Sequence, residues 1–374
     1  MFRLFILLIL LLPVSFLNGQ PIITSESLPK FGDTILMASD NLPENIAILK
    51  KGGNQNWDLM GLQSAFTQKQ KIQPVANSKK PQPFKKANLV IESVNGHQSF
   101  FQKTGNTIYL LGSNGKDPMN IGVETTTRYK NPVLSMKYPL KYGDSSTITG
   151  EYAFKVAIFD LPREKMYTLP ITPDSIRYRC IFTQNKKVDA WGTLSLPDNN
   201  YEVLREKIIE EKEYRVDVKI GNLPWQDITS SVDDPLIQKK HLNYSYHFHS
   251  NETNSKVAVA YMKENQVNPK AVYYTVSDPS STMRTADGRP DVYAYPNPAI
   301  NEVRFEFSNL KPNTYALKIY NILGMVVRQE NYNLNGFNTV KLDISKLRKG
   351  TYLYNLTDAK GKTIATRRLM VIRP

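Results

Sequence analysis

The histidines and carboxylates are the residues of this sequence that could do chemistry. In residues 242–249, aromatic and polar side chains alternate strictly, which predicts a strand with two unlike faces. The polar face carries His247 and His249, which could bind a metal ion together, but a closed zinc site takes four ligands. Because the chain has four histidines and one cysteine, we expect no metal site here. The aromatic face could stack on a sugar ring, but core packing is the expected role.

Carboxylates offer a second kind of chemistry, the general acid–base pair of a glycan hydrolase. Such a pair is defined by a separation of roughly 5 to 10 Å, which a sequence does not give. The candidates are Asp144, Asp160, Asp189, Asp233 and Asp234. The Asp233-Asp234-Pro235 segment is typical of a turn. The sequence has no glycine-rich phosphate loop, no His-Glu-x-x-His and no Gly-x-Ser-x-Gly, so no cofactor is expected.

The single cysteine, Cys180, lies in a segment that alternates like a strand, residues 177–182. One cysteine cannot form a disulfide within the chain, so the fold is not stabilised by disulfides. A reactive thiol needs an activating group nearby, and the local sequence offers none. We expect Cys180 to be a buried, inert side chain.

The last part of the chain shows the most regular pattern. Apolar and polar residues alternate in four short segments, at 303–307, 315–319, 340–344 and 352–356. Period-two alternation predicts strands with one buried face. Turn signals separate them at Lys311-Pro312-Asn313, Gly324, Asn335-Gly336, Gly350 and Gly361. Short strands at this spacing predict a small antiparallel sandwich.

Three motifs in this region resemble a known family. They are Tyr295-Pro296-Asn297-Pro298, then Tyr320 with Gly324, then Leu347 with Gly350 and Tyr352. Their order and their position near the end of the chain are similar to the type A C-terminal sorting domain of the type IX secretion system of Bacteroidota. The resemblance implies an immunoglobulin-like sandwich read by an outer-membrane translocon and removed by a sortase-like protease. The part of the chain before this domain, its passenger, would then be linked to anionic lipopolysaccharide or released.

Residues 1–19 have the pattern of a secretory signal peptide, with a positive start, an apolar run and small residues before a cleavage site between Gly19 and Gln20. The apolar run is too short to span a bilayer, and no later segment reaches that length, so no transmembrane segment is expected in the mature chain. The formal net charge is +14. In an exported protein this balance favours an anionic lipopolysaccharide or polysaccharide as a partner over nucleic acid.

The chain divides into a signal peptide (1–19), two β-regions (20–130 and 131–276), a polar linker (277–290) and the sorting domain (291–374). Within the second β-region, residues 136–144 and residues 188–197 with 201–205 resemble an uncharacterised β-rich module of exported Bacteroidota proteins, which adds nothing about chemistry. The sequence therefore predicts an all-β protein with a sandwich-type passenger, in one or two sandwiches. Two functions stay open for the passenger: a non-enzymatic binding or surface protein, and a secreted hydrolase acting on glycan.

Overall fold

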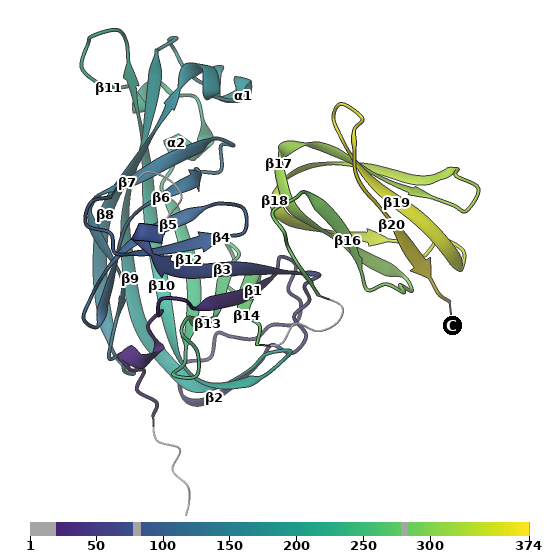
Figure 1. Cartoon of the computed structure of the whole chain (residues 1–374), viewed down its shortest axis with the longest axis horizontal. Coiled ribbons are helices and arrows are strands. Elements are labelled where there is room, and N and C mark those ends of the chain that lie inside the picture. The colour runs from purple at the N-terminus through teal and green to yellow at the C-terminus, as the bar shows by residue number, and fades with distance from the viewer. Residues whose placement is uncertain (1–19, 78–83, 278–282, 374) are drawn as a thin grey trace, which may run out of the picture.

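The computed structural model describes residues 20–77, 84–277 and 283–373. The fold is nearly all β, as the alternation predicts, and it consists of a large N-terminal body and a smaller C-terminal one (Figure 1). The signal peptide predicted at 1–19, including Gly19, lies outside the described residues. We refer to the larger body, residues 20–277 as far as they are described, as the passenger.

The passenger is built from strands of very unequal length. They are β1 (Thr34–Asp40), β2 (Gly52–Asp58), β3 (Phe66–Pro74), β4 (Leu89–Ser93), β5 (Gln98–Thr104), β6 (Thr107–Lys116), β7 (Glu124–Lys137), β8 (Ser145–Ala157), β9 (Ser175–Ser195), β10 (Asn200–Lys219), β11 (Gln226–Asp227), β12 (His241–His249), β13 (Lys256–Met262) and β14 (Pro269–Thr275). Two short α-helices, α1 (Arg163–Met166) and α2 (Pro235–Gln238), and short 3-10 turns at Ser25–Ser27, Val75–Asn77, Ile158–Asp160 and Thr229–Ser231 connect them.

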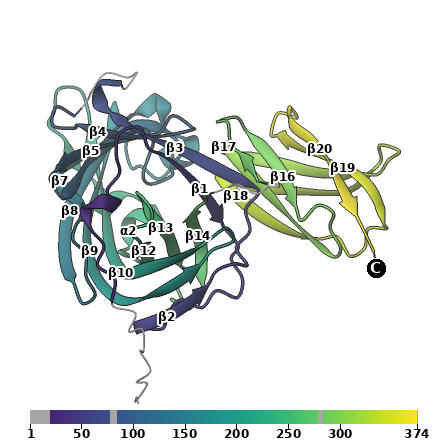
Figure 2. The ribbon, with the colours of Figure 1, turned by 60° about the horizontal axis from the view of Figure 1, so that its bottom comes forward.

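The strand pairings of the passenger return to their starting point. From β9 they run through β10, β12, β13, β14, β1, β3, β4, β5, β6, β7 and β8, and β8 pairs with β9 again. The strands accordingly curve around one another, as seen in Figure 2. Both predicted β-regions contribute to this single circuit, and the expected boundary at residue 130 falls inside β7. The passenger is thus one curved sheet and not two separate sandwiches.

The longest pairing in this circuit is the hairpin of β9 and β10. Its register runs from Asn200 opposite Ser195 to Lys219 opposite Ser175, with one irregularity between Arg205 and Glu206. On β9 the alternating side chains of Ile176, Tyr178, Cys180 and Phe182 enter an apolar core, which confirms the strand predicted there. Residues 206–213 are part of strand β10.

Apolar side chains pack on both faces of the curved sheet. One core lies under the β2 segment and contains Trp57, Tyr246 and Phe248, so the aromatic face of β12 is core, as expected. A second core contains Ile72 of β3, Leu89 of β4, Val188 of β9, Leu204 of β10 and Tyr138, the residue after β7. Because alternate residues of one strand point to opposite faces, the polar face of β12 is turned away from the aromatic core.

The C-terminal body is a separate sheet with its own core. Its strands are β16 (Asp291–Tyr295), β17 (Glu302–Tyr320), β18 (Val326–Asp343), β19 (Gly350–Asp358) and β20 (Thr363–Val371), in the order β16-β17-β19-β20 with β18 also paired to β17. Its buried side chains, among them Phe305, Leu317, Tyr354 and Leu369, all come from residues 292–371. The tail therefore carries a hydrophobic core that owes nothing to the passenger.

Two turns predicted in the tail are wrong. The Lys311-Pro312-Asn313 segment lies within β17 and Asn335-Gly336 lies within β18. The register shifts there, with Leu310 opposite Gly336 and Asn313 opposite Leu334. The two strands thus continue as one long bent hairpin, because an irregularity in the ladder bends a strand without ending it.

The two bodies meet through polar and apolar contacts. The carboxylate of Glu306 accepts hydrogen bonds from the Ser64 hydroxyl at 3.0 Å and from the Ala65 backbone nitrogen. Arg304 forms an ion pair with Asp40 at 3.2 Å. A small apolar cluster beside them includes Phe66, and strand β15 (Arg284–Thr285) pairs in parallel with β3. Polar bonds and a small apolar cluster thus join bodies whose main cores are separate.

Candidate functional site

The first sorting motif is held against the last strand of the tail. Asn297 donates from its side-chain nitrogen to the Arg368 carbonyl at 2.8 Å, and its side-chain oxygen accepts from the Met370 nitrogen at 2.8 Å. Both X-Pro bonds of this motif, Tyr295–Pro296 and Asn297–Pro298, are cis. The motif therefore closes the edge of the sandwich between β16 and β20.

The other motif residues also have structural roles. The Tyr352 hydroxyl donates to the Arg348 carbonyl at 2.8 Å and so connects β19 to the turn before it. Gly350 is the first residue of β19. The side chains of Tyr320 and Asn355 are hydrogen bonded across β17 and β19. Arg373 donates to the Leu347 carbonyl at 2.7 Å. The polar groups of the motif therefore maintain the shape of the domain.

The turn that contains Gly324 presents a different feature. Gly324 has φ +78°, a left-handed conformation that favours glycine, and the Asn321 side chain accepts from the Leu323 and Met325 nitrogens at 3.0 Å. Around this ordered turn the apolar side chains point outward: Ile322 is 80% exposed and Leu323 76%. We call Ile322, Leu323, Met325, Val326 and Val327 the apolar tip. Packing within the domain does not account for these exposed side chains, whereas recognition by a partner would.

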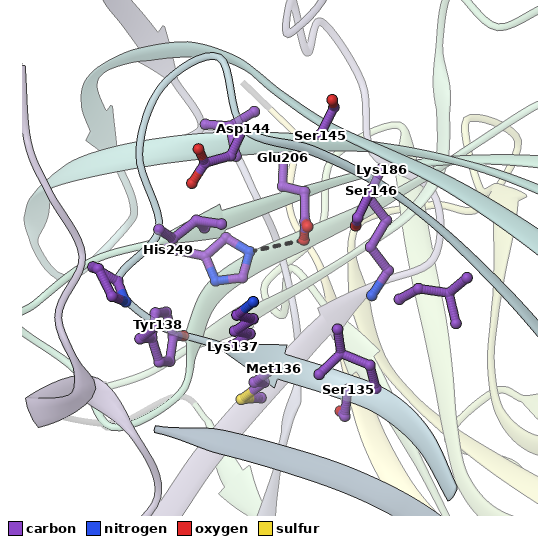
Figure 3. Close-up of a pocket in the computed structure, with 15 residues that line it drawn as sticks. Ser135, Met136, Lys137, Tyr138, Asp144, Ser145, Ser146, Lys186, Glu206 and His249 are labelled. Atoms are coloured by element: carbon purple, nitrogen blue, oxygen red, sulfur yellow. Dashed lines mark hydrogen bonds and ion pairs between the residues drawn. The ribbon is translucent and has the colours of Figure 1, made fainter. Parts of the chain in front are cut away.

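The passenger has a cavity of about 350 Å³ that brings together segments far apart in sequence. Its lining comes from the end of β7, the β7–β8 connection, the start of β8, two residues of β9 and one residue each of β10 and β12. Figure 3 shows Glu206, His249, Lys186 and Tyr138 around this space. We call it the interior cavity. Its size falls in the range of pockets that take small ligands, roughly 300 to 1,000 Å³.

A hydrogen-bonded pair of ionisable side chains lies in the interior cavity. His249 on β12 and Glu206 on β10 approach to 3.2 Å between Nε2 and Oε2, and both side chains are largely buried. Burial opposes ionisation of Glu206, but the His249 hydrogen bond and the positive charges of His249 and Lys186 outweigh it, so the pKa of the Glu206 carboxyl is lowered. Glu206 is therefore an ionised acceptor and a poor proton donor.

His247 lies on the same polar face as His249. Its Nε2 is 3.1 Å from the Ser245 hydroxyl, and burial, with the nearby charge of Lys256, holds the pKa of its imidazole well below the ordinary value. The Nδ1 atoms of both histidines are buried and have no hydrogen-bond partner among the described residues. Within residues 20–77, 84–277 and 283–373, no three histidine, cysteine or carboxylate side chains converge as a metal site would require.

The carboxylates proposed from sequence have mostly structural roles. Asp189 forms a buried ion pair with Arg205 at 2.9 Å. Asp234 caps α2 by accepting from the Leu236 nitrogen, also at 2.9 Å. Asp144 accepts from the Lys141 nitrogen in a turn, yet it also lines the interior cavity with Glu206. Glu206 itself was not singled out from the sequence, because only the β10–β12 register brings it beside His249.

Cys180 is buried and free, as expected. Burial raises the pKa of its thiol to about 11, so the nucleophilic thiolate is scarce at neutral pH. No chemistry is assigned to it.

The fold thus defines a two-part all-β protein, a large curved sheet followed by a small sandwich with its own core. Residues 293–372 of that small sandwich match the family described as the secretion system C-terminal sorting domain. No curated protein matches the sequence significantly. The chain therefore carries a type IX sorting domain, and it is exported by that system to the cell surface or the medium.

Two solved structures are similar over most of this chain, but only remotely. Dimeric latent PorU from Porphyromonas gingivalis is 10% identical with a TM-score of 0.21, and the match covers 92% of this chain and 30% of that one. PorZ, a surface component of the type IX secretion system of the same organism, is 10% identical with a TM-score of 0.19, covering 94% and 53%. The chain thus spans less than a third of PorU and about half of PorZ, and neither likeness bears on its role.

None of the helices in the described ranges combines the length and the apolar character needed to cross a bilayer.

Proposed function

We propose that the passenger is a non-enzymatic binding protein that acts at the cell surface or in the medium. The observation that supports this is the state of the groups in the interior cavity. Its buried carboxylate, Glu206, is already paired with His249 and kept ionised, so the cavity offers fixed charges and hydrogen-bond groups rather than a poised proton donor.

The route to that location has several steps in this proposal. The segment 1–19 directs the chain to the periplasm and is cut between Gly19 and Gln20. The sorting domain, residues 291–374, is then read by the outer-membrane translocon, and a sortase-like protease cuts within the linker 277–290. The passenger, formed from the regions 20–130 and 131–276, is linked to anionic lipopolysaccharide or released.

The apolar tip supports the step in which the translocon recognises the sorting domain. It projects from an ordered turn and does not pack in the domain's core, whereas the motif residues Asn297 and Tyr352 hold that core together. We propose that the translocon contacts this tip directly, and that the polar motif residues act by maintaining the shape.

A second candidate, a glycan hydrolase, rests on one observation: Asp144 and Glu206 line the same cavity. A hydrolase of this kind needs one carboxyl group with a raised pKa to protonate the leaving group. The pKa of Glu206 is instead lowered, which favours binding over hydrolysis.

The test separates the two functions directly. The exported protein would be incubated with a panel of envelope glycans, with binding and product release both recorded. Binding without release of reducing ends supports the proposed function. Release that is abolished by Glu206→Gln and Asp144→Asn would contradict it and establish the hydrolase.

A further inference from the structure

The interior cavity adjoins a second hollow of about 620 Å³ on the same strands. The two share Ser145, Ser146 and Lys186, so they form a continuous region across β8, β9 and β10. Lys51, Lys187 and Lys207 line the second hollow. We call this second hollow the lysine groove.

In this combined region the carboxylates have side-chain partners more often than the lysines do. Two of its carboxylates already have a side-chain partner: Glu206 is hydrogen bonded to His249, and Asp189 forms an ion pair with Arg205. The lysines have no such partner, because no ion pair with another described residue involves Lys51, Lys137, Lys186, Lys187 or Lys207. Five lysines thus line the region against three carboxylates, Asp144, Glu206 and Asp189, so the lysines are in excess.

The lysines also affect one another. Lys256 on β13 lies close enough to Lys186 that burial and the charge of Lys186 together lower the pKa of its ammonium to about 8. Two ammonium groups held near each other inside a fold repel, and a bound anion would relieve this repulsion. Such a site gains affinity for an anion without any rearrangement of the sheet.

Hydroxyl and imidazole groups complete the site. Tyr138, Ser145 and Ser146 line the cavity, and hydroxyls both donate to and accept from the hydroxyls of a sugar. His249 is 5% exposed and lines the same cavity, and its Nδ1 has no partner among the described residues. A buried polar atom left without a partner is costly, which points to a bound group that would satisfy it.

We propose that the interior cavity and the lysine groove together bind an anionic sugar, one that carries a carboxylate or a phosphate group. The anionic group lies between Lys186 and Lys137, and the sugar hydroxyls are held by Tyr138 and the serines of β8. This inference rests on the proposed binding function of the passenger and names its ligand class.

Calorimetric titration of the purified exported protein tests the proposal with three probes: glucuronate, glucose 6-phosphate and glucose. One or both anionic sugars should bind, more weakly as salt rises, whereas glucose should not. Lys186→Ala and Lys137→Ala should each weaken that binding by about tenfold, since a hydrogen bond to a charged group contributes that much. Lys186→Arg should retain most of it.

The matched control is Lys270→Ala, which removes one positive charge from the exposed part of β14, outside both hollows. It should leave the affinity unchanged, and thermal unfolding should show that all variants are folded. Equal binding of glucose, no binding of either anionic sugar, or equal affinity of folded Lys186→Ala would overturn the assignment. If a neutral glycan binds instead, the ligand class is wrong but the binding function stands; if reducing ends are released, the binding function itself is wrong.

Discussion

Glu306 of the sorting domain accepts a hydrogen bond from the backbone nitrogen of Ala65 in the passenger, and both groups are buried. Main-chain and hydroxyl donors of the passenger thus enclose a carboxylate of the tail, and the charge of Asp40 lies nearby. The tail is attached to the passenger through groups that titrate, while its own core is independent.

This contact should weaken as the pH rises. Burial raises the pKa of Glu306 from 4.5 to about 7, although the bonds from Ala65 and Ser64 act in the opposite direction. Because the docked state holds the proton more tightly, docking is strongest below about pH 4.5 and loses on the order of 3 kcal/mol as the pH passes 7. Asp40 also lies in this contact: burial raises the pKa of its carboxyl, whereas the charge of Arg304 from the tail lowers it.

Hydrogen exchange in residues 64–67 measures this effect, after correction for intrinsic rates. Protection should be greater at about pH 5 than at about pH 8, and Glu306→Gln should reduce the difference to the part due to Asp40. Protection that rises with pH in the unmodified chain would show that the carboxylate form is the docked one.

The tail should unfold independently of the passenger. Phe305 is fully buried and packs edge-on against Tyr354, with ring centroids 5.0 Å apart. Phe305→Ala should therefore cost the tail about 3 to 5 kcal/mol. In calorimetry one transition should move to lower temperature while that of the passenger stays in place. A uniform shift of a single transition would mean that the two bodies fold as one unit.

The apolar tip should matter for export and not for folding. Leu323→Ser alters an exposed side chain, so the unfolding temperature of the tail should stay within about a degree or two. The fraction of protein outside the cell should nevertheless fall. Leu353→Ser is the matched control, because Leu353 is an exposed leucine of the same domain outside the tip. Equal export of both variants would show that the tip is not part of the surface that the translocon recognises.

The Glu206–His249 pair should stabilise the passenger in a pH-dependent way. The pKa of Glu206 is lowered on folding, so its contribution is present above its ordinary value of 4.5 and is lost as the pH falls. Glu206→Gln replaces the charged acceptor of a buried hydrogen bond from His249 and should cost about 1 to 3 kcal/mol at neutral pH.

Denaturant unfolding of the two proteins at several pH values checks this, and the difference between them should shrink in acid. Glu211→Gln on the same strand is the control. Its partner Lys240 is exposed, and such surface pairs contribute at most about 1 kcal/mol. A Glu206 variant no less stable than the Glu211 variant would mean that the pair does not stabilise the passenger.

The parts of the fold that follow from local alternation could be predicted from the sequence. The segments 303–307 and 352–356 are strands because every second side chain is apolar, and Cys180 is buried because its neighbours alternate in the same way. The local alternation alone is enough to predict which of these side chains are buried.

Long-range register could not be predicted. Lys137, Glu206 and His249 meet in one cavity because β7, β10 and β12 belong to a sheet that closes on itself, and nothing near each residue indicates its partner. The turns expected at 311–313 and 335–336 failed for a related reason. Proline and glycine mark a break in regular pairing, but whether the chain reverses or only bends depends on the strand opposite.

The central claim is that the C-terminal sandwich is an independent sorting domain that directs export of the passenger. The most direct measurement is cell fractionation, with mass spectrometry of the chain termini, of the full chain and of a chain ending at residue 290. We predict that the full chain gives a passenger outside the outer membrane that ends within the linker, whereas the shortened chain stays in the periplasm. A shortened chain found outside the cell in equal amount would contradict the claim.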